Sequence, residues 1–157
     1  MYWFTADEHY GHANIIKYCG RPFADVEDMD AVLIRRHNAV VGENDTVVHV
    51  GDFTLGNKEF AASIIKQLRG THLFLQGSHD RWLSKGVFLW EHKFGDRYVV
   101  CCHYPMRSWP RSHYGSWQLY GHVHGRGGKH RGQLDIGVDA QVYEPSSWDD
   151  VQRQIFE

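Results

Sequence analysis

The sequence lacks long apolar runs, a disulfide framework and any block of like charge. No stretch reaches the roughly 18 consecutive apolar residues that a membrane-spanning helix requires, so no span is predicted. The opening residues, MYWFTADEHYGH, reach acidic and histidine side chains too early for a secretory signal peptide. The three cysteines, Cys19 and the neighbours Cys101 and Cys102, are an odd number with poor spacing for disulfides. They favour a reducing compartment, and we expect a cytoplasmic protein.

Neither sign of charge dominates: 17 Lys and Arg stand against 19 Asp and Glu, a formal charge of −2. Because no basic block exists, we expect no binding of long duplex nucleic acid. The chain also has no tandem repeat, low-complexity segment or Pro/Ser-rich linker. At 157 residues it is therefore expected to form one domain over residues 1–157.

Histidine is present in excess, with 12 residues. It is the commonest metal ligand in proteins, although exposed histidines are also common. The interpretation therefore depends on where the histidines fall relative to the expected strands.

The first half of the chain predicts strands over residues 2–6, 45–50 and 71–76. Between them, residues 25–41 and 57–70 place apolar side chains at spacings of three and four, which favours amphipathic helices. Asn57 is the expected N-cap of the second helix and Gly70 its stop. This β-α-β-α-β order favours adjacent parallel strands joined by right-handed crossovers.

The second half predicts a hairpin around Gly95–Asp96 between residues 87 and 104, and further strands in 116–125 and 133–143. Residues 145–156 predict a closing helix with Ser146 or Ser147 as its cap. Parallel strands followed by hairpins indicate an α/β fold. We expect a four-layer α/β/β/α sandwich with two mixed sheets and the functional site at the carboxyl ends of the strands.

Each expected strand end carries candidate metal ligands. In chain order these are Asp7 and His9, then Asp52, then Ser78 beside His79 and Asp80, then His103, and finally His122 and His124. A glycine beside a ligand lets the backbone turn sharply and approach an ion closely.

Each of these blocks is weak alone, and His103 by itself would more often be structural. His122 and His124 are more specific, because alternate residues in a turn can direct two imidazoles to one side. Such blocks recur in order, each after a β-like run. Histidines with structural or surface roles would instead be scattered among caps and surface positions, so the recurrence argues against that alternative.

The mixture of nitrogen and oxygen ligands suits manganese, iron, nickel or zinc better than calcium. Asp7, Asp52 and four histidines exceed what one tetrahedral zinc needs, so two divalent ions are the economical interpretation, with Mn²⁺ preferred. Two ions about 3.5–4 Å apart can stabilise a phosphoryl-transfer transition state.

Together the blocks resemble the calcineurin-like metallophosphoesterase superfamily. The family pattern is Asp-x-His, Gly-Asp, Gly-Asn-His-Asp/Glu, a single His and Gly-His-x-His, and it appears here in order from residue 7 to residue 124. The segments HYGHANIIKYCGRPF, HYPMRSW and SWQLYGHVHG are similar to the small bacterial and phage members. The resemblance covers nearly the whole chain, without the cap domain of larger members.

The resemblance implies one ion held by Asp7, His9 and His124. It implies a second ion held by His103, His122 and residue 78, with Asp52 bridging the two. A metal-bridging hydroxide would attack phosphorus in line. His79 would steady the phosphoryl group or protonate the leaving oxygen. Asp80 is a candidate for orienting His79, with a helix cap or a pair with Arg81 as alternatives.

Ser78 departs from the family pattern, which has asparagine at this position. Serine is shorter and its neutral hydroxyl is a weak ligand, so the second ion should be held loosely or through a water. A natural variant, a natural loss of function and a deliberate Asn→Ser change all fit the sequence. We expect an active lineage in which this copy is impaired.

Further residues are candidates for substrate contact. His12 is either a substrate contact or a loop cap, and Arg107 either a phosphate contact or a solvated charge. Arg21, Arg111 and Arg126 are weaker candidates of the same kind. The residues Trp109, His113, Tyr114 and Trp117 are candidates for an aromatic shelf for a nucleobase. We expect a structural or surface role for His37, His49, His72, His92 and His130.

The sequence thus predicts a dinuclear-metal-dependent phosphohydrolase, and a phosphodiesterase rather than a monoesterase because the uncapped site is open. Small phosphate esters such as nucleotides, cyclic nucleotides, nucleic-acid ends or aryl phosphodiesters are the expected substrates. Two alternatives remain: a non-catalytic metal-binding interaction module of the same fold, and a mononuclear protein without turnover.

Overall fold

Short runs rich in β-branched and aromatic residues form the strands of this protein. The structure, a computed structural model, describes residues 1–155. The first sheet contains β1 (Tyr2–Thr5), β2 (Thr46–His49), β3 (Thr71–Phe74) and β8 (Ser146–Ser147). The second contains β4 (Leu89–Phe94), β5 (Arg97–Cys102), β6 (Trp117–Tyr120) and β7 (Gln133–Asp135). The helices are α1 (Ala13–Cys19), α2 (Val26–Val40), α3 (Lys58–Ile65) and α4 (Trp148–Gln154), with a 3₁₀ turn η1 (Ser112–Tyr114).

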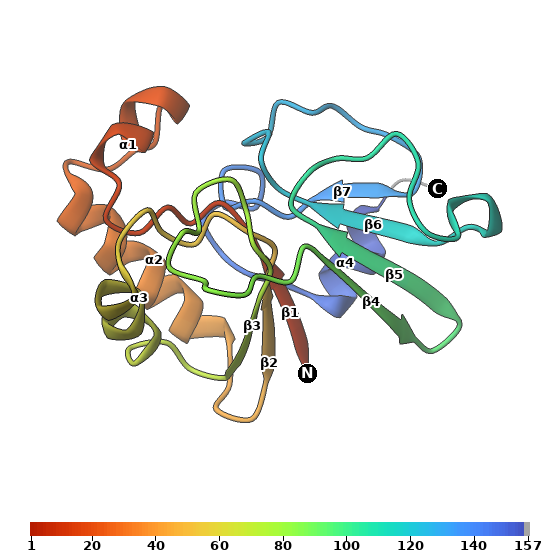
Figure 1. Ribbon diagram of the computed structural model, residues 1–157, viewed down its shortest axis with the longest axis horizontal. Coiled ribbons are helices and arrows are strands. Elements are labelled where there is room, and N and C mark those ends of the chain that lie inside the picture. The colour runs from red at the N-terminus through yellow and green to blue at the C-terminus, as the bar shows by residue number, and fades with distance from the viewer. Residues whose placement is uncertain (156–157) are drawn as a thin grey trace.

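Both sheets are mixed, which confirms the expectation from the sequence. In the first, ordered β3-β2-β1-β8, the strands β1, β2 and β3 are parallel and β8 runs antiparallel to β1. In the second, ordered β4-β5-β6-β7, the expected hairpin pairs β4 with β5, while β6 and β7 follow in parallel. Helices α1 to α3 lie beyond the first sheet, away from the second (Figure 1).

Two apolar cores hold these layers together. One joins the sheets through residues such as Phe4, Val48 and Leu119. The other packs α2 and α3 onto the first sheet through residues such as Met29 and Ile64. Each core removes apolar surface from water on one side of the first sheet, so that β1 and β2 are buried on both faces.

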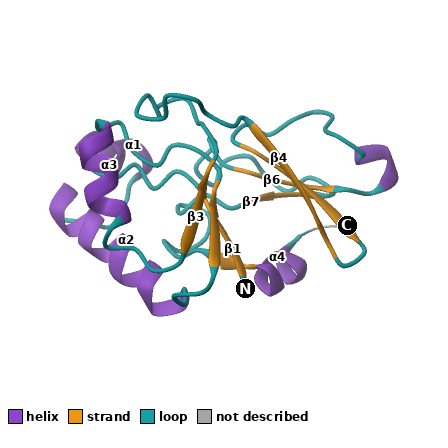
Figure 2. Cartoon of the chain, turned by 60° about the horizontal axis from the view of Figure 1, so that its bottom comes forward, coloured by secondary structure: helices purple, strands orange, loops and turns teal. Residues whose placement is uncertain are grey.

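On the side of the second sheet, α4 is the only α-helix among residues 1–155. The ring of Trp148 in α4 packs against Phe4, Phe94 and Trp117, which come from both sheets. Figure 2 shows α4 below and between the sheets. The expected α/β sandwich with two mixed sheets is therefore confirmed, and α4 packs at the junction of the two sheets.

Helix ends follow the expected capping chemistry in part. The Asn57 side chain accepts a hydrogen bond from the Phe60 amide, and Ser147 forms a capping box with Asp150. However, α3 ends at Ile65 rather than near Gly70. The reason is that the Gln67 and Leu68 amides donate to the carbonyls of Ile64 and Ile65, three residues earlier, which tightens the chain into turns.

Helix α1 was not predicted from the sequence. One further expectation was wrong, the strand over residues 133–143. Strand β7 ends at Asp135, because the Ile136 amide donates to Tyr120 of the second sheet while the Val138 amide donates to Ala6 of the first. The chain crosses between the sheets at this point. Phe156, at the end of the expected closing helix, lies outside the described residues.

No helix within residues 1–155 combines the length and the apolarity needed to cross a membrane. The three cysteines are free thiols.

Candidate metal centre

Local backbone strain marks the predicted metal ligands. Eight non-glycine residues in the described chain have positive φ, and five of them, between 50° and 71°, are Asp7, His9, Asp52, His122 and His124. A left-handed conformation costs a residue with a side chain about 1–2 kcal/mol. Such strain persists only where the surroundings enforce it, and it concentrates at functional sites.

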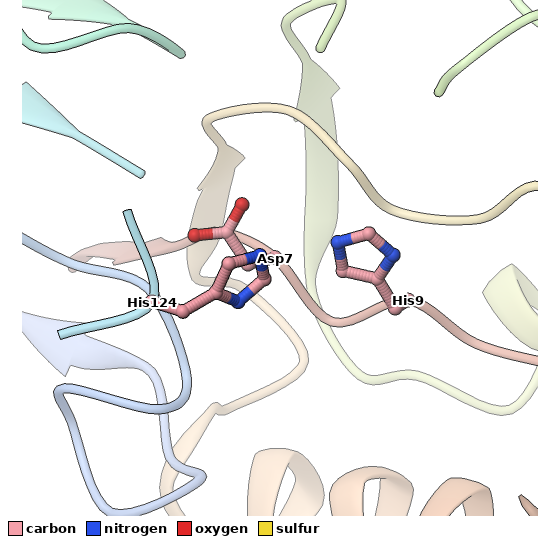
Figure 3. A group of neighbouring side chains, drawn as sticks. All are labelled: Asp7, His9 and His124. Atoms are coloured by element: carbon pink, nitrogen blue, oxygen red, sulfur yellow. The ribbon is translucent and has the colours of Figure 1, made fainter. Parts of the chain in front are cut away.

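The first group of side chains is Asp7, His9 and His124, whose ligand atoms all lie within 4.8 Å of one another. Figure 3 shows how two chain segments bring these residues together, one following β1 and one following β6. The Asp7 carboxylate also accepts hydrogen bonds from the His122 amide, at 3.0 and 2.9 Å. Those bonds fix the ends of β1 and β6 relative to one another, although the strands belong to different sheets.

The second group is Asp52, His103 and His122, again within 4.8 Å of one another. His103 Nδ1 lies 3.0 Å from the Val50 carbonyl, which can only accept a hydrogen bond, so this nitrogen carries the proton. Burial lowers the pKa of His103, but the Asp52 and Asp7 carboxylates outweigh burial and raise it overall. In its neutral form the ring presents Nε2 as a ligand atom, 3.3 Å from Asp52 Oδ2. His9 Nε2 lies 3.5 Å from the same oxygen. Asp52 therefore stands between the two groups, as a bridging ligand would.

The donor set fits two divalent ions. His9 Nε2 and His103 Nε2 are buried nitrogens without a hydrogen-bond partner in the described chain. Leaving such an atom unsatisfied costs about 1–3 kcal/mol, which a coordinated ion would offset. Burial lowers the pKa of His9 to about 3, so its ring is in the neutral form that binds metals. Imidazole nitrogens and carboxylate oxygens suit the borderline divalent ions.

Glycines next to the ligands allow these close approaches. A Cβ atom on Gly51 would lie 2.5 Å from His103 Nδ1, and one on Gly77 would lie 2.3 Å from Asp52 Oδ1. No side chain fits at either distance. Both glycines are therefore required by the packing around Asp52 and His103.

Sequence analysis missed Asp139, which holds His124. Asp139 Oδ2 lies 2.7 Å from His124 Nδ1 and also accepts from Arg21 Nη2 at 2.8 Å. The strand expected over residues 133–143 placed Asp139 inside a strand and not after its end, so the sequence did not mark Asp139 as a candidate. With β7 ending at Asp135, Asp139 becomes another acid beyond a strand end.

Arg21 was considered as a loop cation for phosphate, and the structure corrects this. Its side chain is fully buried and donates to the carbonyl oxygens of Asp7 and Glu8, at 2.6 and 2.9 Å, as well as to Asp139. These hydrogen bonds hold in place the segment after β1, which carries Asp7 and His9 of the first group.

Asp80 also has a different role from the one expected. Its buried carboxylate accepts from the backbone amides of Asp52, Phe53, Thr54 and Gly77, and the Trp82 indole donates to it as well. Within residues 1–155, no hydrogen bond joins Asp80 to His79. Asp80 is therefore a positioning residue that fixes the loop after β2 and the turn after β3, and it does not contact the reacting groups.

Ser78 and His79 lie beside Asp52. Ser78 Oγ donates to Asp52 Oδ2 at 3.0 Å, and the His79 amide donates to Asp52 Oδ1 at 2.9 Å. The His79 ring is 45% exposed, with Nε2 3.9 Å from Asp52 Oδ2. Both residues thus reach the edge of the predicted metal centre, and the His79 ring stands where it can meet a substrate.

Of the two expected substrate contacts, the structure brings His12 to the centre. His12 Nδ1 lies 3.2 Å from His9 Nδ1. Arg107 is exposed and makes no hydrogen bond or ion pair within residues 1–155. Its role in binding substrate stays a prediction.

Two exposed tyrosines that sequence analysis did not select border the centre. The Tyr104 ring packs edge-on against the His122 ring, with 4.7 Å between the ring centroids, and Tyr104 is 42% exposed. Tyr18 is 65% exposed and packs edge-on against His12 at 6.3 Å. Tyr104 directly follows the candidate ligand His103, and this adjacency was the signal that could have identified it.

The histidines expected at structural or surface positions include a connected set, in which His37 and His49 are buried and His72 is half-buried. His49 Nδ1 lies 2.5 Å from Glu8 Oε1, and His49 Nε2 lies 2.9 Å from His72 Nδ1. His37 stacks on His49 at 6.2 Å. Burial lowers the pKa of His49 to about 3 and those of His37 and His72 to about 4, so these rings are uncharged parts of the core.

We expect the stability of the metal-free protein to fall between about pH 6.5 and pH 8. Burial raises the pKa of Asp7 to about 7 and that of Glu8 to about 8, whereas both carboxyls ionise near pH 4 in an unfolded chain. In this range the folded state retains protons on these carboxyls, and each retained proton lowers stability by up to about 1.4 kcal/mol per pH unit. The histidines with lowered pKa values act in the opposite direction and offset part of this fall near pH 6.5, so the fall is steepest above about pH 7.

Urea unfolding at pH 6.5 and pH 8 with a chelator present measures this slope. The Glu8→Gln variant should have a shallower slope, and added Mn²⁺ should remove the contribution of Asp7. A stability that rises from pH 6.5 to pH 8 would contradict the assignment of buried, protonated carboxyls.

Comparison with known proteins agrees with this fold. No family model matches the sequence. The chain is 30% identical over 156 residues to an uncharacterized protein of Methanocaldococcus jannaschii, covering 94% of this chain and 86% of that protein. Among solved structures, a protein of unknown function from Aquifex aeolicus aligns with a TM-score of 0.78 at 22% identity, covering 99% of both chains. A predicted phosphoesterase from Streptococcus pneumoniae aligns with a TM-score of 0.50 at 14% identity, covering 87% of this chain and 70% of that one.

The identity and coverage place this chain in one family with the archaeal protein. The order of the ligand blocks resembles the calcineurin-like metallophosphoesterase pattern, and the two mixed sheets match the fold of the streptococcal protein. This chain therefore has a metallophosphoesterase-like fold.

Proposed function

We propose that the protein is a metal-dependent phosphodiesterase that uses two divalent ions, with Mn²⁺ as the preferred metal. The observation that carries the proposal is the convergence of two ligand groups on Asp52, with two buried imidazole nitrogens left unpaired beside it. A binding site for one ion would need only one of these groups. The three free thiols favour a reducing, cytoplasmic location for this single-domain enzyme.

In this proposal, Asp7, His9 and His124 would hold one ion, and His103 and His122 would hold the other. Asp52 would be shared between the two groups, and Ser78 would lie beside the second. When bound, two such ions supply Lewis-acid stabilisation of the phosphoryl oxygens and activation of a water nucleophile. Asp139 orients His124 by its hydrogen bond to Nδ1, and the Val50 carbonyl orients His103 in the same way.

The residues around the centre fit a substrate with an ester group to expel. The exposed His79 imidazole can donate a proton to the leaving oxygen as the bond to phosphorus breaks. The exposed ring of Tyr104 lies beside His122, and the exposed ring of Tyr18 lies beside His12. These features support a phosphodiester with a nucleobase or aryl group, because a flat ring packs well against exposed tyrosines.

Ser78 supports the second candidate function, a metal-binding module without turnover. In the family pattern an asparagine amide oxygen occupies this position, whereas here the Ser78 hydroxyl is directed to Asp52 as a donor. A hydroxyl engaged in this way offers the second ion one ligand fewer. We therefore expect that ion to bind more weakly than the first.

A manganese titration of this protein beside its Ser78→Asn variant tests both functions. Metal bound per chain and hydrolysis of bis(p-nitrophenyl) phosphate are followed together, with Asp52→Asn as the control that removes the bridging carboxylate. We expect asparagine to tighten the second ion and to raise turnover, each by about tenfold or more.

The outcomes separate the candidates. Equal binding and turnover in both proteins would show that serine is a tolerated residue at position 78. One ion per chain and no hydrolysis by either protein would favour the module without turnover. Unchanged metal binding in Asp52→Asn would contradict the bridging role on which the proposal rests.

A further inference from the structure

Positive charge is segregated into the two loops that begin at predicted metal ligands. These are the β5–β6 loop, residues 103–116, and the β6–β7 loop, residues 121–132. From residue 103 to residue 132 the chain has five basic residues and no acidic one, a formal charge of +5 in a protein whose total is −2. The five cations are spread along both loops and so form no block in the sequence: Arg107, Arg111, Arg126, Lys129 and Arg131.

These cations are open to solvent and not neutralised. All five side chains are exposed. Within residues 1–155 none of them forms an ion pair with a carboxylate. Arg126 Nη2 donates to the Tyr18 carbonyl at 2.7 Å, and the Arg111 guanidinium lies 4.5 Å from the centre of the Tyr98 ring. Neither contact supplies a negative charge, so the two loops form a basic surface on an acidic protein.

The two loops contact one another. Gln133 Nε2, just after the β6–β7 loop, donates to the Met106 carbonyl of the β5–β6 loop at 2.8 Å. A Cβ atom on Gly132 would lie 3.5 Å from the Trp109 ring, and Trp109 and Arg131 line one cavity. Both loops leave the metal-centre end of the second sheet and return to its far end, which Figure 1 shows at the right. Their cations therefore belong to one continuous surface.

This surface extends away from the metal centre. Arg126 lies at the near end, because it bonds to Tyr18, whose ring packs against His12. Arg111 lies at the far end, over Tyr98 near the start of β5. Tyr98 precedes His103 by five residues of extended chain, which is roughly 16 Å. Charges drawn out over this length match a chain of anionic groups better than a single anion.

Aromatic rings alternate with the cations along the β5–β6 loop. Tyr104 is 42% exposed and Tyr114 is 81% exposed. Trp109 is half-buried, and its Nε1 donates to the Ser116 carbonyl at 3.2 Å. Cations beside exposed aromatic faces are the combination that binds phosphates and stacks bases in single-stranded nucleic-acid sites. An acidic peptide or an anionic membrane would meet the cations but offers no run of flat rings.

We propose that the two loops form a track that binds single-stranded nucleic acid and leads the strand to the metal centre. Its phosphates contact the loop cations, and its bases stack on the exposed rings, among them Tyr114 of the aromatic shelf expected from the sequence. The assignment of a nucleic-acid strand as substrate rests on the proposed phosphodiesterase, whereas binding to the track needs no divalent ion. A duplex hides its base faces and is bound less tightly, in line with the expectation from the sequence.

Fluorescence anisotropy of a labelled oligothymidylate in EDTA, which prevents metal-dependent hydrolysis, tests the proposal. A length of about 12 nucleotides lies within the range of known single-strand sites. Five phosphate contacts would give a slope of about −3.5 for the logarithm of the binding constant against the logarithm of the salt concentration.

Two variants test the two kinds of contact. The double variant Lys129→Glu/Arg131→Glu should weaken binding about tenfold or more and make the salt dependence shallower. Tyr114→Ala, which removes one exposed ring, should weaken binding about tenfold. The matched control is Arg35→Glu/Lys66→Glu, which changes the net charge equally at exposed positions on α2 and just after α3. This control should bind the oligonucleotide nearly as the parent does.

Four results would overturn the proposal. The first is no binding by the parent at about 50 mM salt, where phosphate contacts are strong. The second is an equal loss of affinity in the two double variants, which would reduce the effect to net charge. The third is a duplex of the same length bound as tightly as the single strand. The fourth is polyglutamate competing as well as unlabelled oligonucleotide, which would indicate an acidic protein partner.

Hydrolysis of bis(p-nitrophenyl) phosphate by the Mn²⁺-loaded parent is measured separately. Its absence would overturn the proposed phosphodiesterase and would leave the binding of the oligonucleotide to the track standing. Hydrolysis without binding of the oligonucleotide would overturn the track alone.

Discussion

Asp80→Asn is expected to lower the free energy of unfolding by about 3–5 kcal/mol, the range found when one partner of a buried charged group is removed. The Asp80 carboxylate is buried and accepts hydrogen bonds from four backbone amides and one indole. An asparagine amide has one acceptor oxygen and one NH₂ group. That NH₂ group would face amide donors, leaving at least two of them without an acceptor.

The same substitution should weaken metal binding without touching a ligand. The two shortest amide contacts of Asp80 are to Asp52 at 2.6 Å and to Gly77 at 2.8 Å. They hold the left-handed backbone of Asp52, whose φ is 59°, in the position that faces both ligand groups. Relaxation of that residue would move its carboxylate, so we expect the affinity for Mn²⁺ to fall by about 10- to 100-fold.

Urea unfolding with a chelator and a manganese titration measure these two effects. Asp96→Asn, at the exposed tip of the β4–β5 hairpin, is the matched control and should change neither quantity. A loss of stability below about 1 kcal/mol would contradict the view that Asp80 fixes the loop after β2. A large loss with unchanged metal affinity would limit its role to folding.

Much of the fold could be predicted from the sequence because its signals are local. The hairpin at Gly95–Asp96, the Asn57 cap and the parallel strands of the first half each follow from a few neighbouring residues. The end of β7 could not be predicted in this way. It depends on hydrogen bonds from residues 136 and 138 to two different sheets, and such long-range pairings leave no periodic trace in the sequence.

The residues of the candidate site likewise divide into those that the sequence predicts and those that it does not. Residues that would touch a metal follow strand ends in recognisable blocks, so the sequence predicts them. Residues that hold those ligands are recognisable only in three dimensions. Asp139 lies 15 residues from His124 in the sequence, and Asp80 lies 28 from the amide of Asp52 that it binds. The alternatives left open for Arg21 and Asp80 did not include the roles found, since burial and backbone contacts decide them.

His79→Ala is expected to reduce kcat by about 10²- to 10⁴-fold while leaving metal binding unchanged. The backbone amide of His79, and not its side chain, donates to Asp52 Oδ1 at 2.9 Å. Alanine keeps that amide, so the bridging carboxylate stays in place. The ring is 45% exposed and supplies neither group with a ligand atom. Loss of turnover without loss of metal would therefore isolate the part played by the imidazole.

The dependence on leaving group decides what the imidazole does. Two phosphodiester substrates separate the roles, one that expels an alcohol and one that expels p-nitrophenolate, which leaves without a proton. If His79 protonates the leaving oxygen, the alanine variant should lose far more kcat on the substrate that expels the alcohol. If the ring instead steadies the phosphoryl group, both reactions should slow equally. His130→Ala, an exposed histidine that contacts the Gly127 carbonyl, is the control. A kcat within about twofold of the parent for both substrates would remove His79 from the mechanism, because positioned acids and bases contribute far larger factors.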